Sequence, residues 1–529
     1  MHDHLEDMGK EIVRQEFPDE KEKRSRLWLY EDVCEVLEEN KGTDKIKGIV
    51  VRYFYSQKIC LNGGSFTNLK NLQIFIVRGG MLYGEGVDYL PNHLRVLHLN
   101  SLGSLQLVEG LNWKDMRYLK SIKLSNCHGL TRIPDLSGLT SLEYLELSYC
   151  NDLVEVHPSV GRLDKLVILK LTRCEKLQMF QERINMKSLE TLYLSDCWNL
   201  KFFPEFDGDM KSLKYLDLSH TRIKELPCSV GNLTGLKSLS LAGCRNLTNV
   251  PSSIFYGLQR LEELNLSECS NLVTFPAKSE SLPPPVFSTT LSRLQVDLTN
   301  CRRLEEISEF PREIACRLEG CGSLERVSYL SKILKSKDSK MFGRLDLTSC
   351  QRLCDNLALL MTSGQEAESG SEKLAALLTL FFSGAKSEEF QVKFFGSPLI
   401  PLPNWFTCRR LYWELITREH EFCIEIPQNS NWYSKGLALC IQSRFSEGPY
   451  SVYINGVKFD EMSTWRRQMV WVHYIPLVTV IRRLSECGMP PPDMFRVMFR
   501  FGYNYTGSRK PLEGSWGVHL IEDLEEESR

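Results

Sequence analysis

The sequence has almost no net charge and no long hydrophobic run. Its 65 lysine and arginine residues nearly balance 67 aspartate and glutamate residues, so the formal net charge is -2 over 529 residues. The two signs are interspersed and form no basic stripe of the kind that binds phosphate backbones, so nucleic acid is not the favoured partner. The longest apolar run, Leu374–Phe382, has nine residues. Because a membrane span needs roughly twenty, we interpret this run as a buried helix and expect no span.

Several short motifs are also absent. The sequence has no Gly-x-x-x-x-Gly-Lys-Ser/Thr loop that would hold nucleotide phosphates. Residues 1–14 are charged and lack the apolar segment of a secretory signal. Cysteines and histidines show no pairing typical of a nucleophile and its base, so we assign no catalytic residue. Cys-x-x-Cys pairs are missing too, and we therefore predict no metal site.

One pattern recurs through the middle of the chain: Leu-x-x-Leu-x-Leu-Ser-x-Cys-x-x-Leu, followed by an apolar residue. Its cysteines recur every 23 to 25 residues, except for one step of 47 that spans two repeats and places Thr221 at the cysteine position. This period and leucine pattern predict a leucine-rich-repeat solenoid. The cysteines of the regular repeats are Cys127, Cys150, Cys174, Cys197, Cys244 and Cys269.

Each repeat is expected to make one short strand. Leucines two residues apart point to the same face of a strand, and the following cysteine and leucine fill the same core. Because no single coil can bury its own leucines, the coils stack, and their strands form the parallel sheet of a horseshoe. The expected core of the central repeats comprises Leu145, Leu147, Cys150, Leu169, Leu171, Cys174, Leu192, Leu194 and Cys197.

The array is predicted over residues 46–355 and becomes irregular after about residue 275. Ile49 and Val51 fit its first strand, whereas Cys301, Cys321 and Cys350 keep the pattern at uneven spacings of 32, 20 and 29 residues. Residues 279–290 and 331–340 are interpreted as inserted loops. Nine of the 18 cysteines occupy the repeat position, where stacked coils favour a buried, reduced thiol, so we expect a reducing compartment.

The side chains between the strand leucines should project from the concave face of the sheet, next to those of the neighbouring columns. This face is the predicted partner-binding surface, with tyrosine and arginine as the favoured anchors because such residues dominate interface hot spots. The candidate residues are Lys123, Glu146, Tyr149, Lys170, Arg173, Tyr193, Tyr215, Asp217 and Asn265.

The first fifty residues carry a second signal. Apolar residues at helical spacing, among them Met8 and Ile12, predict one helix, and a second is predicted over Glu31–Glu39. This part closely resembles the end of the nucleotide-binding module in plant TIR-type nucleotide-binding leucine-rich-repeat immune receptors, where a Met-His-Asp motif begins a helix of a winged-helix subdomain. The repeats resemble the array of the same family. The matching segments are Met1–Asp3, Met8–Gln15, Arg24–Trp28 and Glu31–Ile49.

The C-terminal part agrees with this resemblance. Short strand-like runs alternate with turns and predict an all-β sandwich. It is similar to the jelly-roll and Ig-like domain that follows the repeats in these receptors. The predicted strands are Phe422–Ile426, Leu437–Ile441, Tyr450–Ile454, Met469–Tyr474, Met498–Phe501 and Gly517–Ile521. The matching segments are Gly396–Ser397, Pro403–Phe406, Ile424–Pro427, Gly436–Cys440, Tyr474–Pro476 and Trp516–Ile521.

The resemblance implies four parts: residues 1–45, a winged-helix remnant with a linker; 46–355, the repeats; 356–392, a helical or irregular connector; and 393–525, the sandwich. It implies the sensor portion of an intracellular receptor, cytoplasmic or nuclear, that binds a pathogen effector or a guarded host protein and restrains a nucleotide switch. Full-length members bind ADP or ATP and carry a TIR domain that cleaves NAD. His2 matches a histidine that contacts ADP, but we expect it not to function alone, and we expect no enzymatic activity.

Two other classes of protein remain open. A repeat adaptor or scaffold, such as a ubiquitin-ligase substrate receptor, would need an adaptor-docking motif, and none is evident before residue 49. An extracellular receptor ectodomain would require disulfide-linked caps and glycosylation. Co-purification with ligase subunits would favour the adaptor, whereas free thiols at Cys127 and Cys150 would exclude the ectodomain.

Overall fold

The computed structural model of the chain describes most of the repeats and the strands that follow them. The described residues are 3–52, 57–79, 81–84, 86–100, 113–208, 210–276, 294–308, 315–328, 343–347, 350–361, 370–383, 389–395, 402–403, 408–412, 419–425, 435–443, 450–462, 469–490, 492, 494–501 and 514–521. They form two compact units, one extending to Asn265 and the other beginning at Leu266. None of the helices in these ranges is both long and apolar enough to cross a membrane.

The first unit begins with two helices, α1 (Asp3–Glu16) and α2 (Tyr30–Glu38). The second agrees within one residue with the helix predicted over Glu31–Glu39. Between them, the buried guanidinium of Arg24 donates to Asp32 on α2 at 2.8 Å and to the carbonyl of Phe17 at 2.8 Å. This ion pair ties the segment after α1 to α2. The winged-helix identity of this region stays a prediction.

The parallel sheet starts earlier than the sequence indicated. Strand β1 (Arg26–Leu27) pairs in parallel with β2 (Gly48–Arg52), with Leu27 opposite Ile49. The expectation that Ile49 and Val51 begin the sheet was therefore wrong. The two residues of β1 lack a leucine-repeat pattern, and only the tertiary pairing reveals this strand.

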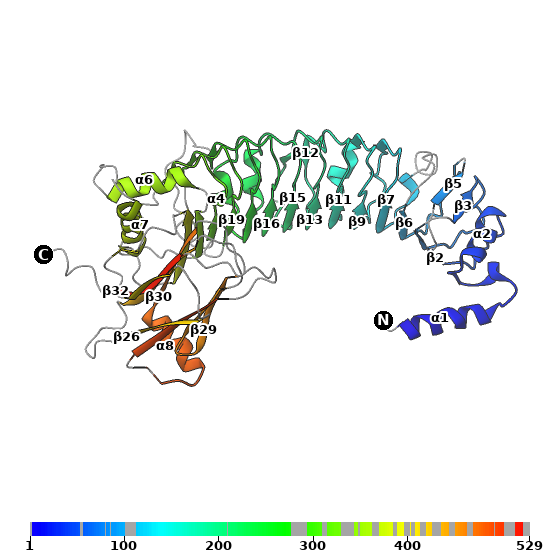
Figure 1. The fold of residues 1–529 in the computed structure, drawn as a ribbon. Coiled ribbons are helices and arrows are strands. Elements are labelled where there is room, and N and C mark those ends of the chain that lie inside the picture. The colour runs from blue at the N-terminus through cyan, green and yellow to red at the C-terminus, as the bar shows by residue number, and fades with distance from the viewer. Residues whose placement is uncertain are drawn as a thin grey trace. The chain divides into compact units, whose positions relative to one another are not determined.

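The predicted leucine-rich-repeat solenoid is confirmed by the next strands, which pair in parallel in chain order (Figure 1). Equivalent leucines stand opposite each other, as Leu145, Leu169 and Leu192 do. The strands are β4 (Ile74–Arg78), β6 (Val96–Asn100), β7 (Ser121–Ser125), β9 (Tyr144–Glu146), β11 (Ile168–Lys170), β13 (Thr191–Tyr193), β15 (Tyr215–Asp217), β16 (Ser238–Ser240) and β17 (Glu263–Asn265).

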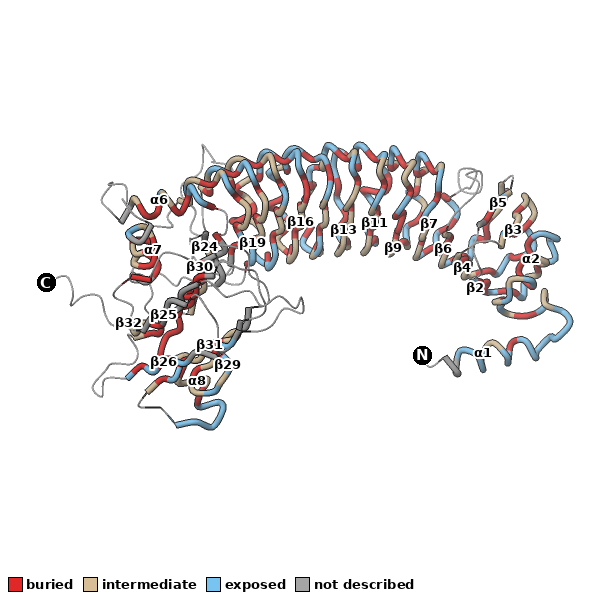
Figure 2. Tube along the Cα trace, in the orientation of Figure 1, coloured by how far each residue is buried: buried red, intermediate tan, exposed pale blue. Residues whose placement is uncertain are grey.

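The other side of each coil is built from two-residue strands and short helices. β8 (Arg132–Ile133) pairs with β10 (Glu155–Val156), and β12 (Arg183–Ile184) pairs with β14 (Glu205–Phe206). Buried residues recur in every coil along this array (Figure 2). All nine residues expected in the central core are at most 1% exposed: Leu145, Leu147, Cys150, Leu169, Leu171, Cys174, Leu192, Leu194 and Cys197. Further elements of this unit are β3 (Lys58–Leu61), β5 (Met81–Gly84), η3 (Pro158–Arg162), η4 (Cys228–Asn232) and α4 (Ser253–Gly257).

The repeat cysteines bind the carbonyls of the preceding coil. The thiols of Cys150, Cys174 and Cys197 donate to the carbonyls of Leu124, Leu147 and Leu171 at 3.1–3.2 Å. All nine cysteines at the repeat position are buried thiols that form no disulfide within the described residues. Thr221, at the same position, donates instead to Leu218 of its own coil at 2.9 Å. A small buried donor at this position therefore gives a backbone carbonyl of the core a hydrogen bond, which for Leu171 adds to that from the amide of Cys174 at 3.3 Å.

The second unit continues the repeat pattern. β19 (Gln295–Asp297) pairs in parallel with β21 (Ala315–Arg317), which pairs with β23 (Gly343–Leu347). On the other side of these coils lie β18 (Thr274–Phe275), β20 (Glu306–Ile307) and β22 (Arg326–Val327). The helices α6 (Gln351–Met361) and α7 (Gly370–Ser383) follow. The run predicted as a buried helix, Leu374–Phe382, lies in α7, where Leu377 and Leu378 are at most 2% exposed. The two predicted inserted loops lie outside the described residues.

The C-terminal strands form two antiparallel sheets with a shared core. The order of neighbouring strands in the first sheet is β24 (Phe390–Phe395), β30 (Met469–Pro476), β27 (Gly436–Ser443), β32 (Gly514–Ile521) and β25 (Cys408–Tyr412). In the second, the order is β26 (Glu419–Glu425), β31 (Met494–Phe501), β28 (Tyr450–Ile454) and β29 (Val457–Met462). Each of the six runs predicted as strands overlaps one of these strands.

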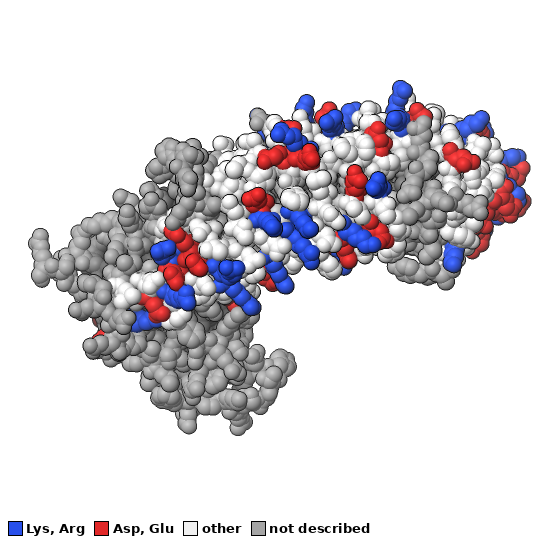
Figure 3. All heavy atoms as spheres, turned by 90° about the horizontal axis from the view of Figure 1, so that it is seen from above, with Lys and Arg blue, Asp and Glu red and all other residues white. Residues whose placement is uncertain are grey.

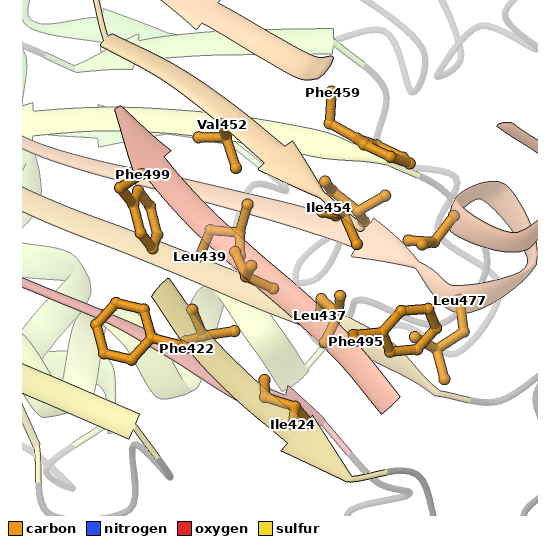
Figure 4. Close-up of a cluster of buried hydrophobic side chains, with 14 of the residues drawn as sticks. Phe422, Ile424, Leu437, Leu439, Val452, Ile454, Phe459, Leu477, Phe495 and Phe499 are labelled. Carbon is orange, nitrogen blue, oxygen red and sulfur yellow. The ribbon is translucent and has the colours of Figure 1, made fainter. Parts of the chain in front are cut away.

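The core between these sheets is apolar and includes helix α8 (Leu477–Glu486). Leu437 and Leu439 of β27 lie close to Phe495 and Phe499 of β31 (Figure 4). β24 also pairs in parallel with β23, so one sheet continues from the last repeat into these strands. The predicted boundary at residues 392 and 393 therefore falls inside a strand. The jelly-roll or Ig-like identity of this region stays a prediction.

Candidate partner-binding surface

The strands of the first unit present one outward side, which we call the strand face. Six predicted partner-binding residues occupy one column on it, each between two buried repeat positions and in register from coil to coil. This register follows from the strand period, which places residues two apart on the same face. The six residues are Lys123, Glu146, Lys170, Tyr193, Asp217 and Asn265.

Lys170 lies at the centre of this column between two aromatic rings. Its Nζ is 5.9 Å from the ring centroid of Tyr144 and 5.7 Å from that of Tyr193. Both distances are within the range of cation–π attraction. Lys170 forms no ion pair within the part of the chain that the structure describes. Its half-buried charge lies between the two rings and near the carboxylate of Glu146, whose pKa it helps to lower.

Glu146 lies deeper than its place in the column suggested. It is 9% exposed and accepts a 2.9 Å contact from Lys123 Nζ and a hydrogen bond from the hydroxyl of Tyr144. Burial alone would raise the pKa of Glu146, but the hydrogen bonds from Tyr144 and Lys123 outweigh it and lower that pKa. Burial and the same bond raise the pKa of Tyr144. Glu146 therefore orients Tyr144 and Lys123 and offers little surface of its own.

Sequence reasoning missed Tyr144. It named Tyr215, which precedes the first leucine of β15, but not Tyr144, which holds the same position on β9. Tyr144 and Glu146 are two residues apart on β9 and hence on the same face, a signal that the strand period could have given. Tyr215 on β15 lies in the same column as Tyr144 and is 43% exposed.

Tyr149 and Arg173 belong to a second column, which follows each strand. Their φ angles are 64° and 59°, and their amides donate to the carbonyls of Thr172 and Ser195 in the next coil, at 2.8 and 2.9 Å. The left-handed conformation costs about 1 kcal/mol or more for such residues. Gly243, with φ 69°, occupies this column in another coil. Asn126, Asp196, His220, Glu268 and Asn300 adopt the same conformation in other coils, so it belongs to the repeat and does not by itself assign a role to Tyr149 and Arg173.

The two side chains contact each other on the surface. The guanidinium carbon of Arg173 lies 5.5 Å from the ring centroid of Tyr149, and its Nε lies 3.5 Å from Asp196 Oδ2. Tyr149 is 43% exposed. The stacked pair is a partly preorganised, amphipathic surface of the kind that anchors protein partners.

Other predicted residues are engaged within the chain or lie farther along it. Asp217 accepts hydrogen bonds from the amide and hydroxyl of Ser219 at 3.0 and 2.6 Å. Asn265 lies on β17, three strands beyond β13. The structure therefore groups Lys170, Tyr193, Tyr149 and Arg173 on adjacent coils and leaves Asn265 apart from them.

Charges at the start of the strands are largely paired between coils. Lys120 and Glu143 are 2.7 Å apart, Glu190 and Lys214 2.8 Å, and Lys237 and Glu262 3.5 Å, all with exposed side chains. Such pairs contribute little stability, between about 0 and 1 kcal/mol each. On the face that Figure 3 shows, basic and acidic side chains are interspersed along the array. This side therefore offers little net attraction to a polyanion.

Two sequence predictions concern bound groups. His2, the candidate nucleotide contact, lies outside the described residues. Among the residues that the structure does describe, no group of three or more His, Cys, Asp and Glu side chains could hold a metal ion.

The repeats match known proteins. A family model described as disease resistance protein RPS4B-like, leucine-rich repeats, matches residues 185–279. TMV resistance protein N of Nicotiana glutinosa is 36% identical over 187 residues, which cover 32% of this chain and 16% of that protein. Disease resistance protein RPS6 of Arabidopsis thaliana is 32% identical over 195 residues, covering 31% and 17%. Disease resistance protein RUN1 of Vitis rotundifolia is 31% identical over 215 residues, covering 31% and 16%.

These matches span only 16% to 17% of the length of the three relatives. Among solved structures, the leucine-rich repeat domain of the type III effector XCV3220 (XopL) is 22% identical, with a TM-score of 0.29, and covers 43% of this chain and 68% of that one. A TM-score this low carries no argument. The family model and the relatives show that the repeats of this chain are similar to the leucine-rich repeats of plant disease resistance proteins.

Proposed function

We propose that the chain is the sensor portion of an intracellular plant immune receptor and binds a protein partner through the strand face. The partner is a pathogen effector or a guarded host protein, as the resemblance to disease resistance proteins suggests. The observation that carries the proposal is Lys170, which is held between the rings of Tyr144 and Tyr193 without an ion pair within the described residues. Tyrosine is among the residues enriched at interface hot spots.

The proposed anchors form a continuous group. Tyr193 neighbours Lys170 across paired strands, and Arg173 and Tyr149 follow the ends of strands β11 and β9. A partner carboxylate at Lys170 would gain charge-assisted hydrogen bonds in a partly desolvated site. The surrounding tyrosines would supply rigid apolar area.

In the intact receptor, the sensor would act on the TIR and nucleotide-binding modules. Partner binding can shift a switch between its ADP-bound and ATP-bound states only if the partner binds one state more tightly than the other. We therefore propose that the repeats, with the C-terminal strands, restrain the resting state until the partner competes with that restraint. The nucleotide itself would be bound by residues of those modules.

A two-hybrid screen of this chain against secreted pathogen proteins and plant host proteins tests the proposal. Each interactor would be retested against Tyr193→Ala and Lys170→Glu, with Asn249→Ala, on the opposite side of the coils, as the control. We expect at least one interactor whose affinity falls about tenfold or more with each strand-face change, as hot-spot truncation does, and is unaffected by the control. Interactors that bind all three variants equally would place recognition elsewhere and refute the proposal.

A further inference from the structure

Three large apolar side chains are exposed on two consecutive coils, away from the strand face. Met179 is 45% exposed, Trp198 49% and Phe202 66%. Met179 and Phe202 stand opposite each other in a parallel bridge between the coils. Trp198 directly follows the repeat cysteine of the second coil. We call Met179, Trp198 and Phe202 the edge patch.

The repeat does not need apolar residues at these positions. The position of Met179 and Phe202 is held by polar residues in other coils, which pair in the same parallel manner. These residues are Arg132, Glu155, Glu225 and Asn249. The position of Trp198, directly after the cysteine, is also polar elsewhere, in His128, Asn151, Glu175 and Arg245. Because neighbouring coils fold with polar residues here, folding does not explain the exposed apolar ones.

Basic residues adjoin the edge patch. Lys201 lies between Leu200 and Phe202, and its amide donates to the carbonyl of Gln178 at 3.1 Å. The side chain of Arg222, in the next coil, donates to Asn199 Oδ1 at 3.3 Å, beside Trp198. Lys201, Arg222 and Lys224 are all exposed. Neither Lys201 nor Lys224 forms an ion pair within the ranges that the structure describes.

We infer that the edge patch is a second protein-binding site, independent of the strand face, and that it takes a segment of a partner protein carrying acidic and apolar residues. Tryptophan, phenylalanine, methionine and arginine are the residues enriched at the core of protein interfaces. The lysines beside them are complementary to carboxylates and would steer an acidic segment onto the patch.

An anionic membrane fits these residues less well. Recognition of anionic lipids generally uses clusters of about four to eight basic residues. Here Lys201, Arg222 and Lys224 lie beside the patch, and Lys176, on the coil of Met179, is paired with Asp152 at 2.6 Å. Glu155, Glu175 and Glu225 lie on the coils around the patch. These carboxylates would be repelled by a charged lipid surface, whereas a narrow peptide segment can avoid them.

The test is selection of short random peptides, displayed on phage, on the purified full chain. The double variant Trp198→Glu/Phe202→Glu is added in excess as a competitor, so that clones which bind outside the edge patch are captured by the variant and discarded. Glutamate at each of these positions copies Glu175, Glu155 or Glu225, so the variant is expected to fold, and its thermal unfolding midpoint checks this. If it unfolds, Trp198→Asn, which copies Asn151, replaces it. We expect discriminating clones that are rich in Asp and Glu and contain Leu, Phe or Trp.

A fluorescein-labelled copy of such a peptide gives the quantitative result. Its affinity for the chain should fall about tenfold or more with Lys201→Glu/Lys224→Glu and should weaken with added salt. Asn249→Glu and Tyr193→Ala should leave it unchanged, so failure here is separate from failure of the strand-face proposal. The inference is overturned if no clone discriminates or if discriminating clones lack acidic residues. It is also overturned if no peptide binds the chain but phosphatidylserine vesicles do, and if these vesicles no longer bind the Trp198→Glu/Phe202→Glu variant.

Discussion

The repeats and the C-terminal strands bury polar groups in different ways. In the repeats, each coil contributes one thiol, such as Cys197, whose Sγ donates to the carbonyl of Leu171 at 3.1 Å. In the C-terminal strands, the fully buried ring of His473 lies between two carboxylates, 2.8 Å from Glu389 and 3.1 Å from Asp460. The first arrangement spreads weak, equivalent bonds along the chain, and the second concentrates charge at one point. A single substitution should therefore be more damaging in the second.

The cluster around His473 connects elements of both sheets. His473 lies on β30 and Asp460 on β29, while Glu389 immediately precedes β24. Arg483 on α8 completes the cluster with an Nη2 that lies 2.8 Å from Glu389 Oε2. With His473 protonated, two cations balance two carboxylates. The balance makes burial of these charges tolerable.

The largest expected effect is that of His473→Leu. It leaves Glu389 and Asp460 with one cation instead of two, and breaking a buried ion pair typically costs about 3–5 kcal/mol of unfolding free energy. Urea unfolding followed by tryptophan fluorescence measures the loss, since Trp471 is buried in the same region. The combined change Glu389→Gln/His473→Gln should cost less than the sum of the two single changes. A loss under about 1 kcal/mol for His473→Leu would show that the cluster is not a concentrated source of stability.

Leu192→Ala should follow, with a loss of about 3 kcal/mol, because it removes a fully buried side chain from the repeat core and leaves a cavity. Because each coil contacts only its neighbours, amide exchange should accelerate most in β11, β13 and β15. Leu97→Ala, at the same position on β6, is the matched control and should accelerate exchange around β6 instead. Uniform acceleration throughout the first unit in both variants would contradict the nearest-neighbour description.

Cys197→Val should have a smaller effect, a loss of about 0.5–1.5 kcal/mol, because the carbonyl of Leu171 loses the thiol donor and keeps the amide of Cys174 at 3.3 Å. Cys197→Thr should lose less, since Thr221 already occupies this position in the next coil and finds a carbonyl. Thermal unfolding of the two variants gives the comparison. Equal midpoints for Val and Thr would mean that the thiol acts by packing and not as a donor.

The smallest expected effect is a pair of opposite pH dependences. Burial, followed by the charges of Lys123 and Arg78, lowers the pKa of His98 on β6. Burial would also lower the pKa of His473, but Asp460 and Glu389 outweigh it and raise that pKa. His98 therefore destabilises the folded repeats as pH falls below the unfolded value of about 6.5. His473 contributes stability that is fully present below about 6.5 and is lost as pH rises through its folded pKa.

Amide exchange measured separately for β6 and β30 between about pH 5 and 8 should show these opposite trends, after correction for the intrinsic pH dependence of exchange. His98→Gln should flatten the trend at β6 only, and His473→Gln the trend at β30 only. Trends of the same sign at both strands would refute the assignment of one opposing histidine to each region.

The strand positions of the repeats were predictable because their cause is local and recurrent. A leucine at every second strand position must be buried, and Leu145, Leu169 and Leu192 are buried because each coil repeats the same constraint. The binding candidates Lys170 and Tyr193 follow from the same period. The pattern could not give the depth of Glu146, because this depends on contacts with Lys123 in the preceding coil and with the hydroxyl of Tyr144.

The sequence by itself determined the period of the coils, the residues that fill their core and the column that faces outward, because these depend on spacing along the chain. Only the tertiary structure decided that β1 joins the sheet and that His473 lies between Glu389 and Asp460. The physical reason is distance along the chain. Each of these contacts joins residues at least 13 positions apart, and no local periodicity records which distant residues the stacked coils and packed sheets bring together.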